Sequence, residues 1–358
     1  MRQTDSASPL ARYLFAAYAL LVVYASMHPF SGWRDPGIAP FAYLAAPLPR
    51  FITTFDVVSK VLGYLPFGFL AVLSLHPRLR GLRAVLLAFV AGAVLSLLME
   101  ALQTYLPSRI ASNVDFAANA SGTLAGALAA AGLAQSLLSE DGLSALRYRL
   151  YRPGARIDFG LVLLGLWVFS QLSPGTLLFG IGDLRPLFHV PTGTLYPAEL
   201  FIRVEALVSC ANAAAIALLV ALLAAPGQPV RGMFVLTLVL ALAVRTLAHG
   251  LLFGPEDLLD WLTPGAGFGV TAGMLIGLVA VALPRAVRLA LCGFAIMAAT
   301  VIVNIAPANP YLADSLATWQ QGQFLNFNGL TRVLSAAWPF VALAYILALS
   351  AGRNRARN

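Results

Sequence analysis

Long apolar runs constrain this chain more than any other feature of its sequence. Ten of them approach 20 residues, which is about the length that a helix needs to cross the hydrocarbon core of a bilayer. The segments between them are too short for a separate soluble domain. We place the ten runs at roughly 11–28, 57–75, 84–106, 116–138, 158–174, 200–224, 232–253, 264–283, 286–306 and 331–350.

The composition agrees with this interpretation. Of the 358 residues, 59% are hydrophobic and 11% are charged, whereas soluble domains are about 45–50% apolar and about 25% charged. We therefore expect an all-α, polytopic membrane helix bundle of about ten transmembrane helices, with the lipid bilayer as its first partner. The oligomeric state does not follow from the sequence.

The basic residues indicate an orientation. A net charge of +8 could indicate nucleic-acid binding, but the arginines flank the apolar runs instead of forming one cluster. With the N-terminus in the cytoplasm, 15 of the 23 basic residues fall in cytoplasmic segments, as the positive-inside rule requires. We expect a multi-pass protein of the inner (plasma) membrane with both termini cytoplasmic, and no nucleic-acid partner.

The spacing of the runs suggests an internal repeat. A shift of 145 residues superposes the first four runs on the next four and places Asp115 on Asp260 and Gly122 on Gly267. Most other matches are Leu or Val, which an apolar chain also gives by chance. We predict a degenerate, parallel 4+4+2 arrangement, with a four-helix unit at 1–140, a second at 141–284 and a two-helix extension at 285–358.

Polar side chains cluster around the third and fourth runs. Glu100 and Gln103 are three residues apart and so share one helix face. Arg109 follows in a short connection, and Asp115 and Asn119 begin the next helix. A carboxylate inside an apolar helix is expensive unless it is paired, so such groups indicate function by default. These five residues are our main candidates for a ligand site.

The second run adds Asp56 and Lys60, which are spaced for a pair on one helix face. Purely structural interpretations stay open for several of these residues. Glu100 and Arg109 could form a buried ion pair between helices, Asp115 could cap its helix, and Asp56 with Lys60 could be a weak surface pair.

Other chemistry-bearing patterns are missing from the sequence. It contains no phosphate-binding loop, no dinucleotide-binding glycine pattern and no nucleophile elbow. Cys210 and Cys292 lie within apolar runs, and no His/Cys group has metal-ligand spacing. We predict no cofactor and no metal, and whether the protein is an enzyme stays open.

The polar residues resemble a known family pattern. "FDVVSKVLGYLPFGFL" followed by "SLLMEALQTYLPSRIASNVDFAANASGTLAG" is similar to the VanZ-like family, over about residues 10–135. The shared pattern comprises Asp56, Pro66, Gly68, Glu100, Gln103, Arg109, Asp115, Asn119, Gly122 and Gly126. Lys60 departs from it, because family members often have His or Asn there.

The resemblance implies a multi-pass membrane protein of the cell envelope, of a type linked to teicoplanin (glycopeptide) resistance, and it brings no catalytic residues. Our first hypothesis is a site for a lipid-linked envelope intermediate at the outer leaflet, or modulation of sensitivity to envelope antibiotics. Arg109 and Lys60 would hold phosphate there, and Glu100 is the candidate general acid/base. The alternatives are a transporter or lipid flippase, and a structural or assembly protein without a ligand.

The second repeat lacks most of this set. Under the 145-residue shift, Glu100 corresponds to Arg245 and Arg109 to Gly254, while Asp260 and Gly267 keep the types of Asp115 and Gly122. We therefore expect Asp115 and Gly122 to be the more architectural members. Arg203, Glu205 and Arg245 are interpreted as an internal ion network.

Overall fold

The structure is a computed structural model that describes residues 9–49, 52–138, 142–173, 175–185, 196–307, 309 and 325–354. These residues form α-helices and two short 3-10 helices, with one isolated β-bridge and no strand among them. The chain divides into two compact units, Met1–Arg149 (unit 1) and Leu150–Asn358 (unit 2). The all-α prediction is confirmed, and the finer 4+4+2 division stays a prediction.

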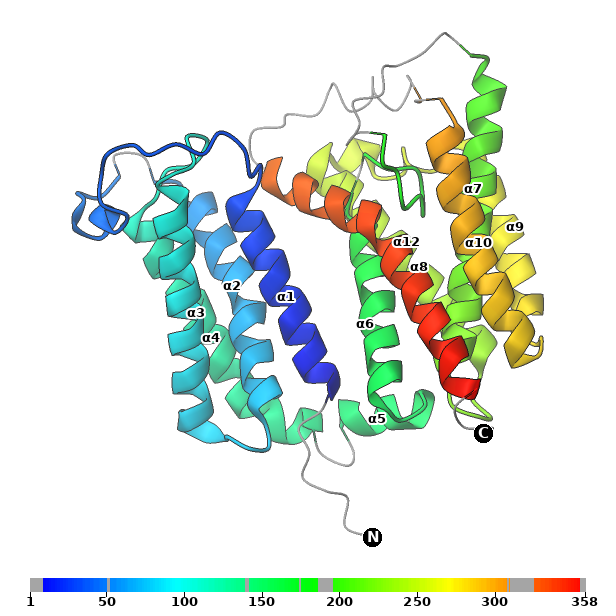
Figure 1. Cartoon of the computed structure of the whole chain (residues 1–358), viewed down its shortest axis with the longest axis horizontal. Helices are drawn as coiled ribbons and strands as arrows, with labels where there is room; N and C mark the ends of the chain where they lie inside the picture. The colour runs from blue at the N-terminus through cyan, green and yellow to red at the C-terminus, as the bar shows by residue number, and fades with distance from the viewer. Residues whose placement is uncertain are drawn as a thin grey trace. The chain divides into compact units, whose positions relative to one another are not determined.

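Unit 1 is built from four long helices, visible in Figure 1 as the blue to green part of the chain. They are α1 (Pro9–Met27), α2 (Thr54–Leu75), α3 (Gly81–Gln103) and α4 (Asn113–Leu138), followed by the short α5 (Leu143–Leu150). A 3-10 helix, η1 (Ala42–Ala45), lies in the connection between α1 and α2. Helix α2 begins at a regular cap, because the Thr53 side chain accepts a hydrogen bond from the Asp56 amide at 3.1 Å.

Helices α2 and α4 approach each other closely because both carry glycine at the contact. A Cβ atom on Gly122 would lie 2.3 Å from the Val61 carbonyl oxygen, and one on Gly126 would lie 1.9 Å from that of Leu65. In return, a Cβ on Gly68 of α2 would lie 2.0 Å from the Thr123 carbonyl oxygen. Only small residues allow this backbone-to-backbone packing.

Unit 2 contains six described helices and is organised around α7. Helix α7 is buried on all sides over Ala213–Leu223, where no residue is more than 8% exposed. Gly269 and Gly273 of α9 meet the carbonyls of Ala206 and Cys210 on α7. The helices are α6 (Ala155–Ser170), α7 (Ala198–Leu223), α8 (Val230–Leu252), α9 (Pro264–Ala280), α10 (Arg285–Ile305) and α12 (Leu325–Asn354), and η2 (Pro255–Asp257) lies between α8 and α9.

Helix α12 closes unit 2 against α6 through two side-chain hydrogen bonds. The indole N–H of Trp338 donates to the Leu163 carbonyl at 2.7 Å, and the Tyr345 hydroxyl donates to the Arg156 carbonyl at 3.0 Å. Trp338 is only 2% exposed. Its N–H therefore has the partner that a buried indole requires.

Eight of the described helices are long and apolar enough to cross a membrane. They lie within α1, α2, α3, α4, α7, α8, α10 and α12. The other two predicted spans coincide with α6 and α9, which have 16 and 17 residues and are about 24–26 Å long, short of a core of about 30 Å. A multi-pass helical membrane protein is confirmed, whereas the count of ten is not.

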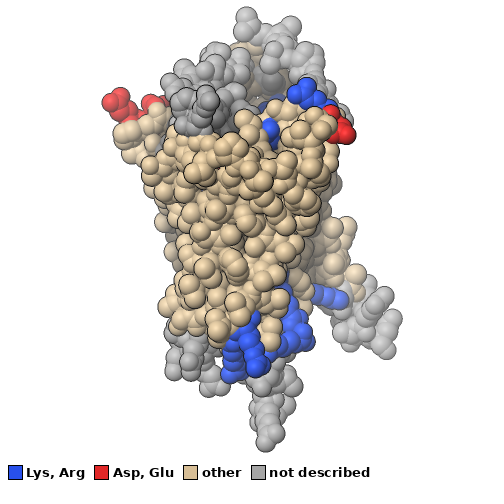
Figure 2. Space-filling view, turned by 90° about the vertical axis from the view of Figure 1, so that its left-hand side faces the viewer, with Lys and Arg blue, Asp and Glu red and all other residues tan. Residues whose placement is uncertain are grey.

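The surface of these helices suits lipid. Leu86, Val90, Val94 and Leu98 of α3 are spaced four apart and are 47–53% exposed, so they form one apolar stripe. Figure 2 shows a broad uncharged belt on this face, with the larger group of blue basic side chains at one end and the red acidic side chains, together with a few blue ones, at the other. The connection between α2 and α3 supplies Arg78 and Arg80, and α3 supplies Arg83.

Candidate functional site

Glu100 lies in the last turn of α3 and is 3% exposed. One of its carboxylate oxygens accepts a hydrogen bond from the Ser112 amide at 3.0 Å. Ser112 immediately precedes α4. The carboxylate therefore links the end of α3 to the start of α4 at the point where the chain turns between them.

Below Glu100, the contact between α3 and α4 is polar. Ser96, one helical turn earlier on α3, is fully buried and accepts a hydrogen bond from the Asn119 side-chain amide at 3.0 Å. Tyr64 of α2 is 6% exposed and is near enough to Glu100 and Ser96 to interact with both electrostatically. Three helices thus contribute polar groups to one buried region, as the spacing of Glu100 and Asn119 predicted.

Gln103 and Arg109 both bind the end of α1. The Gln103 amide donates to the Ser26 carbonyl at 2.9 Å. The Arg109 guanidinium donates to the His28 carbonyl at 2.9 and 3.2 Å and to the Ala25 carbonyl at 3.0 Å. These carbonyls end a helix, where a positive charge is favoured. Both side chains therefore hold α1 against the rest of unit 1.

Burial lowers the pKa of Arg109 below its ordinary value, and the nearby Glu100 carboxylate opposes this effect. Glu100 and Arg109 do not form an ion pair within the part of the chain that the structure describes. The buried Glu100–Arg109 ion pair that the sequence left open is therefore not formed. Each of the two side chains binds main-chain groups instead.

Lys60 and Asp115 form an ion pair between α2 and α4, at the rim of the same region. Their side chains are 34% and 21% exposed, so water reaches both. Both charges also act on Glu100. Asp56 does not take part, because it is exposed and its carboxylate accepts a hydrogen bond from the Thr53 hydroxyl at 2.5 Å. The pairing of Asp56 with Lys60 that their spacing favoured is replaced by Lys60 with Asp115.

The connection from α1 to α2 contributes a residue that the sequence analysis missed. Tyr43, in η1, is 6% exposed, and its hydroxyl donates to the Leu97 carbonyl of α3 at 3.2 Å. Burial, and then the negative charge of Glu100, raises the pKa of Tyr43 to about 12. An isolated tyrosine in a long connection gives no periodic signal, so its place over α3 could not be read from the sequence.

Two further hydrogen bonds hold this connection over the ends of α3 and α4. The Asn113 side chain donates to the Ala46 carbonyl at 2.8 Å, and the Arg34 amide donates to the Tyr105 carbonyl at 3.0 Å. The segment around Tyr43 is thus fixed beside Glu100, which adds to the shielding of that carboxylate from water.

Unit 2 has a second group of buried polar residues. Arg245 of α8, 3% exposed, donates to the carbonyls of Ser173 and Thr176. Glu205 of α7 accepts a hydrogen bond from the Thr263 hydroxyl at the start of α9 and interacts electrostatically with Arg245. Of the predicted network of Arg203, Glu205 and Arg245, the last two lie near enough to interact electrostatically. Each of these two side chains also binds its own main-chain or hydroxyl partner.

No group of three or more His, Cys, Asp or Glu residues with the geometry to hold a metal ion occurs among the described residues. The polar region of unit 1 contains one carboxylate deep in the protein and a second at the rim. The contacts described there are hydrogen bonds and the Lys60–Asp115 ion pair.

Comparison with known proteins finds a family match within unit 1. Residues 11–135 match the family model described as VanZ/LLP1. No curated protein and no solved structure matches the chain. The matched range contains every site residue predicted above and ends before unit 2 begins. Residues 11–135 of this membrane protein are therefore similar to the VanZ/LLP1 family.

Proposed function

We propose that unit 1 binds the phosphate-bearing headgroup of a lipid-linked envelope intermediate, and through it modulates sensitivity to envelope antibiotics. The observation that carries this proposal is the partly exposed Lys60–Asp115 ion pair at the rim of a region whose centre is the buried Glu100. A lipid headgroup moving in the bilayer surface meets such a rim without leaving the membrane.

Lys60 is the residue that we assign to the phosphate. It is 34% exposed and bound to one carboxylate, so an anionic ligand can replace Asp115 as its partner. Arg109 already donates three hydrogen bonds to α1 carbonyls. We therefore propose that Arg109 and Gln103 shape the site by holding α1, while Asn119 and Glu100 form its floor.

Glu100 is the candidate for proton transfer. Its carboxylate lies in a region closed to water, and its one described hydrogen bond comes from the Ser112 amide. A buried carboxylate is a common general acid or base in proteins. A Glu100→Gln variant that retained full activity in an antibiotic-sensitivity assay would remove this role.

We propose that the site faces the outer leaflet and that both termini are cytoplasmic. The Glu100 end of α3 is opposite the end that carries Arg83. Arg78, Arg80 and Arg83 are the kind of short basic segment that is retained in the cytoplasm. This supports an inner-membrane protein whose polar site opens to the outside.

We also propose that residues 141–284, which contain α6 to α9, arose as a degenerate copy of the four-helix segment at 1–140. Two features support a common origin. The α9 glycines meet α7 carbonyls as the α4 glycines meet α2 carbonyls. Arg245 binds the carbonyl of Ser173, and a shift of 145 residues places that residue on His28, whose carbonyl binds Arg109. In both segments an arginine thus binds a carbonyl at the C-terminal end of the first helix, α1 or α6. The two arginines, Arg109 and Arg245, do not stand at equivalent positions under the 145-residue shift.

The test of ligand binding is native mass spectrometry of the full chain with undecaprenyl phosphate, and with undecaprenol as the lipid without phosphate. We expect the wild type to retain the phosphate lipid in preference, and Lys60→Met to lose that preference. Arg83→Met is the matched control, because Arg83 is exposed at the opposite end of α3. Equal retention of undecaprenyl phosphate by the wild type and Lys60→Met contradicts the proposal.

A structural role without a ligand is the second candidate, favoured by the main-chain contacts of Gln103 and Arg109. It predicts that Asn119→Ala lowers the amount of protein in the membrane. Normal abundance with lost antibiotic phenotype would exclude it.

A further inference from the structure

One end of unit 2 carries a group of arginines, and we call it the basic end. At this end α6, α8 and α10 begin, and α7 and α9 finish. Asp158, 2% exposed in the first turn of α6, is the one carboxylate whose side chain the structure describes there. The arginines whose side chains are described at this end are Arg152, Arg156, Arg231, Arg285 and Arg288.

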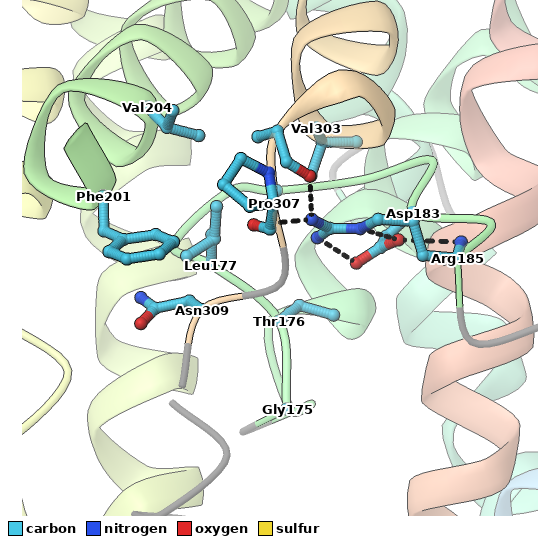
Figure 3. A pocket seen from close by; sticks show the side chains of 12 residues that line it. Gly175, Thr176, Leu177, Asp183, Arg185, Phe201, Val204, Val303, Pro307 and Asn309 are labelled. Atoms are coloured by element: carbon cyan, nitrogen blue, oxygen red, sulfur yellow. Dashed lines mark hydrogen bonds and ion pairs between the residues drawn. The ribbon is translucent and has the colours of Figure 1, made fainter. Parts of the chain in front are cut away.

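At the opposite end of unit 2, two arginines have a carboxylate beside them. The Arg185 guanidinium donates two hydrogen bonds to the Asp183 carboxylate, at 2.9 and 2.7 Å, as Figure 3 shows. Its other described contacts go to two main-chain carbonyls at the end of α10. Arg245 lies near enough to Glu205 to interact with it electrostatically. Neither of these two charges therefore needs an anion from outside the chain.

Arg288, in the first turn of α10, lies at the centre of the basic end. Its Nη1 donates to the Ala221 carbonyl of α7 at 2.9 Å, whereas its Nε is buried and has no described hydrogen-bond partner. Arg288 is partly exposed and forms no ion pair with any residue that the structure describes. A partly buried guanidinium without a counterion is unfavourable, so this position favours an anion.

The charges around Arg288 are positive. Arg152 and Arg285 are both near enough to act on it electrostatically, and like charges repel each other. The Arg152 Nε donates to the Ala224 carbonyl at the end of α7 at 3.0 Å. Such carbonyls offset only part of the charge, because a helix end carries roughly half an elementary charge. An anion among the three arginines would remove the repulsion and add charge-assisted hydrogen bonds.

An apolar stripe on α10 begins beside these arginines. Val287 is next to Arg288 in the sequence, and Val287, Leu291 and Phe294 are spaced four and three residues apart, so they share one helix face. They are 40%, 39% and 62% exposed, on a helix that is long and apolar enough to cross a membrane. A molecule with an anionic head and acyl chains can use both surfaces, whereas a soluble phosphate would leave the stripe uncovered.

We infer that the basic end of unit 2 binds the phosphodiester headgroup of an anionic phospholipid. Arg152, Arg285 and Arg288 surround the phosphate, and an acyl chain lies along the α10 stripe. The planar guanidinium suits phosphate oxygens, and basic sites between membrane helices are typical sites for anionic headgroups. The inference concerns unit 2 alone and does not rest on the function proposed for unit 1.

The test is native mass spectrometry of the delipidated full chain, titrated separately with dioleoyl phosphatidylglycerol and dioleoyl phosphatidylcholine. The two lipids share acyl chains and a phosphate, but only phosphatidylglycerol has a net negative charge. We expect the wild type to retain phosphatidylglycerol in preference. Arg288→Gln and Arg152→Gln should each lower this preference by roughly fivefold, which is what one arginine contributes near an anionic headgroup.

Arg231→Gln is the matched control, because arginines at one end of a membrane helix also attract anionic lipids without forming a site. Arg231 lies at the same basic end, is exposed, and binds the Leu278 carbonyl of α9 instead of α7. The variant removes the same charge, and we expect it to keep the wild-type preference. Size-exclusion chromatography checks folding. Should Arg288→Gln not fold, Arg152→Gln carries the test, because the Arg152 amide keeps its bond to the Leu223 carbonyl.

Four results would overturn the inference. The first is equal retention of the two lipids by the wild type, and the second is an unchanged preference in the folded Arg288→Gln and Arg152→Gln variants. The third is an equal loss of preference in Arg231→Gln, which would show general charge attraction only. The fourth is displacement of phosphatidylglycerol by millimolar glycerol phosphate, which would identify a site for a soluble phosphate ester.

Discussion

Replacing Gly126 with alanine should separate α2 from α4 and destabilise unit 1. The added Cβ would lie 1.9 Å from the Leu65 carbonyl oxygen and 3.0 Å from the Phe69 amide nitrogen. Carbon–oxygen contacts of this kind are about 3.3 Å or longer, so the helices must move apart by about 1.4 Å. Both obstacles are main-chain atoms, which no rotamer change can remove.

The cost follows from this displacement. Overpacking at a tight contact typically costs about 1–3 kcal/mol, and we expect the upper half of that range because two backbones must move together. Gly132→Ala is the matched control on the same helix, since a Cβ there meets nothing within 4 Å. Alanine favours a helix over glycine by about 0.5–1 kcal/mol, so Gly132→Ala should leave the free energy of unfolding unchanged or raise it slightly.

The assay is the free energy of unfolding of both variants by steric trapping in bicelles, with the wild type alongside. The same displacement moves Lys60 on α2 away from Asp115 on α4, so Gly126→Ala should also weaken this ion pair. A Gly126→Ala variant within about 0.5 kcal/mol of Gly132→Ala would refute the close packing on which the site is built.

Three further changes separate architecture from binding. Arg109→Ala should lower the free energy of unfolding by about 1.5–3 kcal/mol, because charged hydrogen bonds to the end of α1 are lost; stability equal to that of the Arg83→Ala control would contradict this. Asp115→Asn should change the free energy of unfolding by less than about 1 kcal/mol, because the ion pair with Lys60 is partly exposed. Retention of undecaprenyl phosphate should not fall. A larger loss of stability would show that the ion pair holds α2 and α4 together. Tyr43→Phe should remove from the ultraviolet tyrosinate titration one group that ionises near pH 12. Because the pKa of Tyr43 is raised on folding, its stabilising contribution is complete below about pH 10 and is lost as the pH rises through about 12; a variant that removes a group ionising near pH 10 would show that Tyr43 is not buried.

The sequence predicted the helices well because lipid sets both their length and their composition. The described bounds of α10, Arg285–Ile305, differ by one residue at each end from the predicted run of 286–306. Helix α6 begins three residues before the predicted run of 158–174 and ends four residues before the end of that run, at Ser170. Helix α5 was not expected at all, because its sequence "LSALRYRL" is too polar to form an apolar run.

The candidate site was predicted as a set of residues but not as a set of contacts. Helical periodicity indicates which side chains of a helix face its neighbour. It therefore predicted that Glu100 and Asn119 would lie in one region. Spacing within one helix favoured Asp56 as the partner of Lys60, yet the tight glycine contact between α2 and α4 brings Asp115 closer. The partners of Arg109 are main-chain carbonyls of α1, and no side-chain pattern encodes those.

Tyr43 shows the limit of such prediction. Its position depends on the path of a long connection over the end of α3, which the hydrogen bonds of Asn113 and Arg34 determine. Interactions between a connection and the main chain carry no periodic signal in the sequence.

Lys60 allows the central claim to be measured directly, because it is the chain's single lysine. In sealed vesicles with the outer face exposed, a membrane-impermeant amine reagent should acetylate Lys60, and peptide mass mapping separates this from reaction at the N-terminal amine. The account predicts that undecaprenyl phosphate slows Lys60 modification and that undecaprenol does not. Equal rates of Lys60 modification with the two lipids, or modification only after the vesicles are opened, would contradict it.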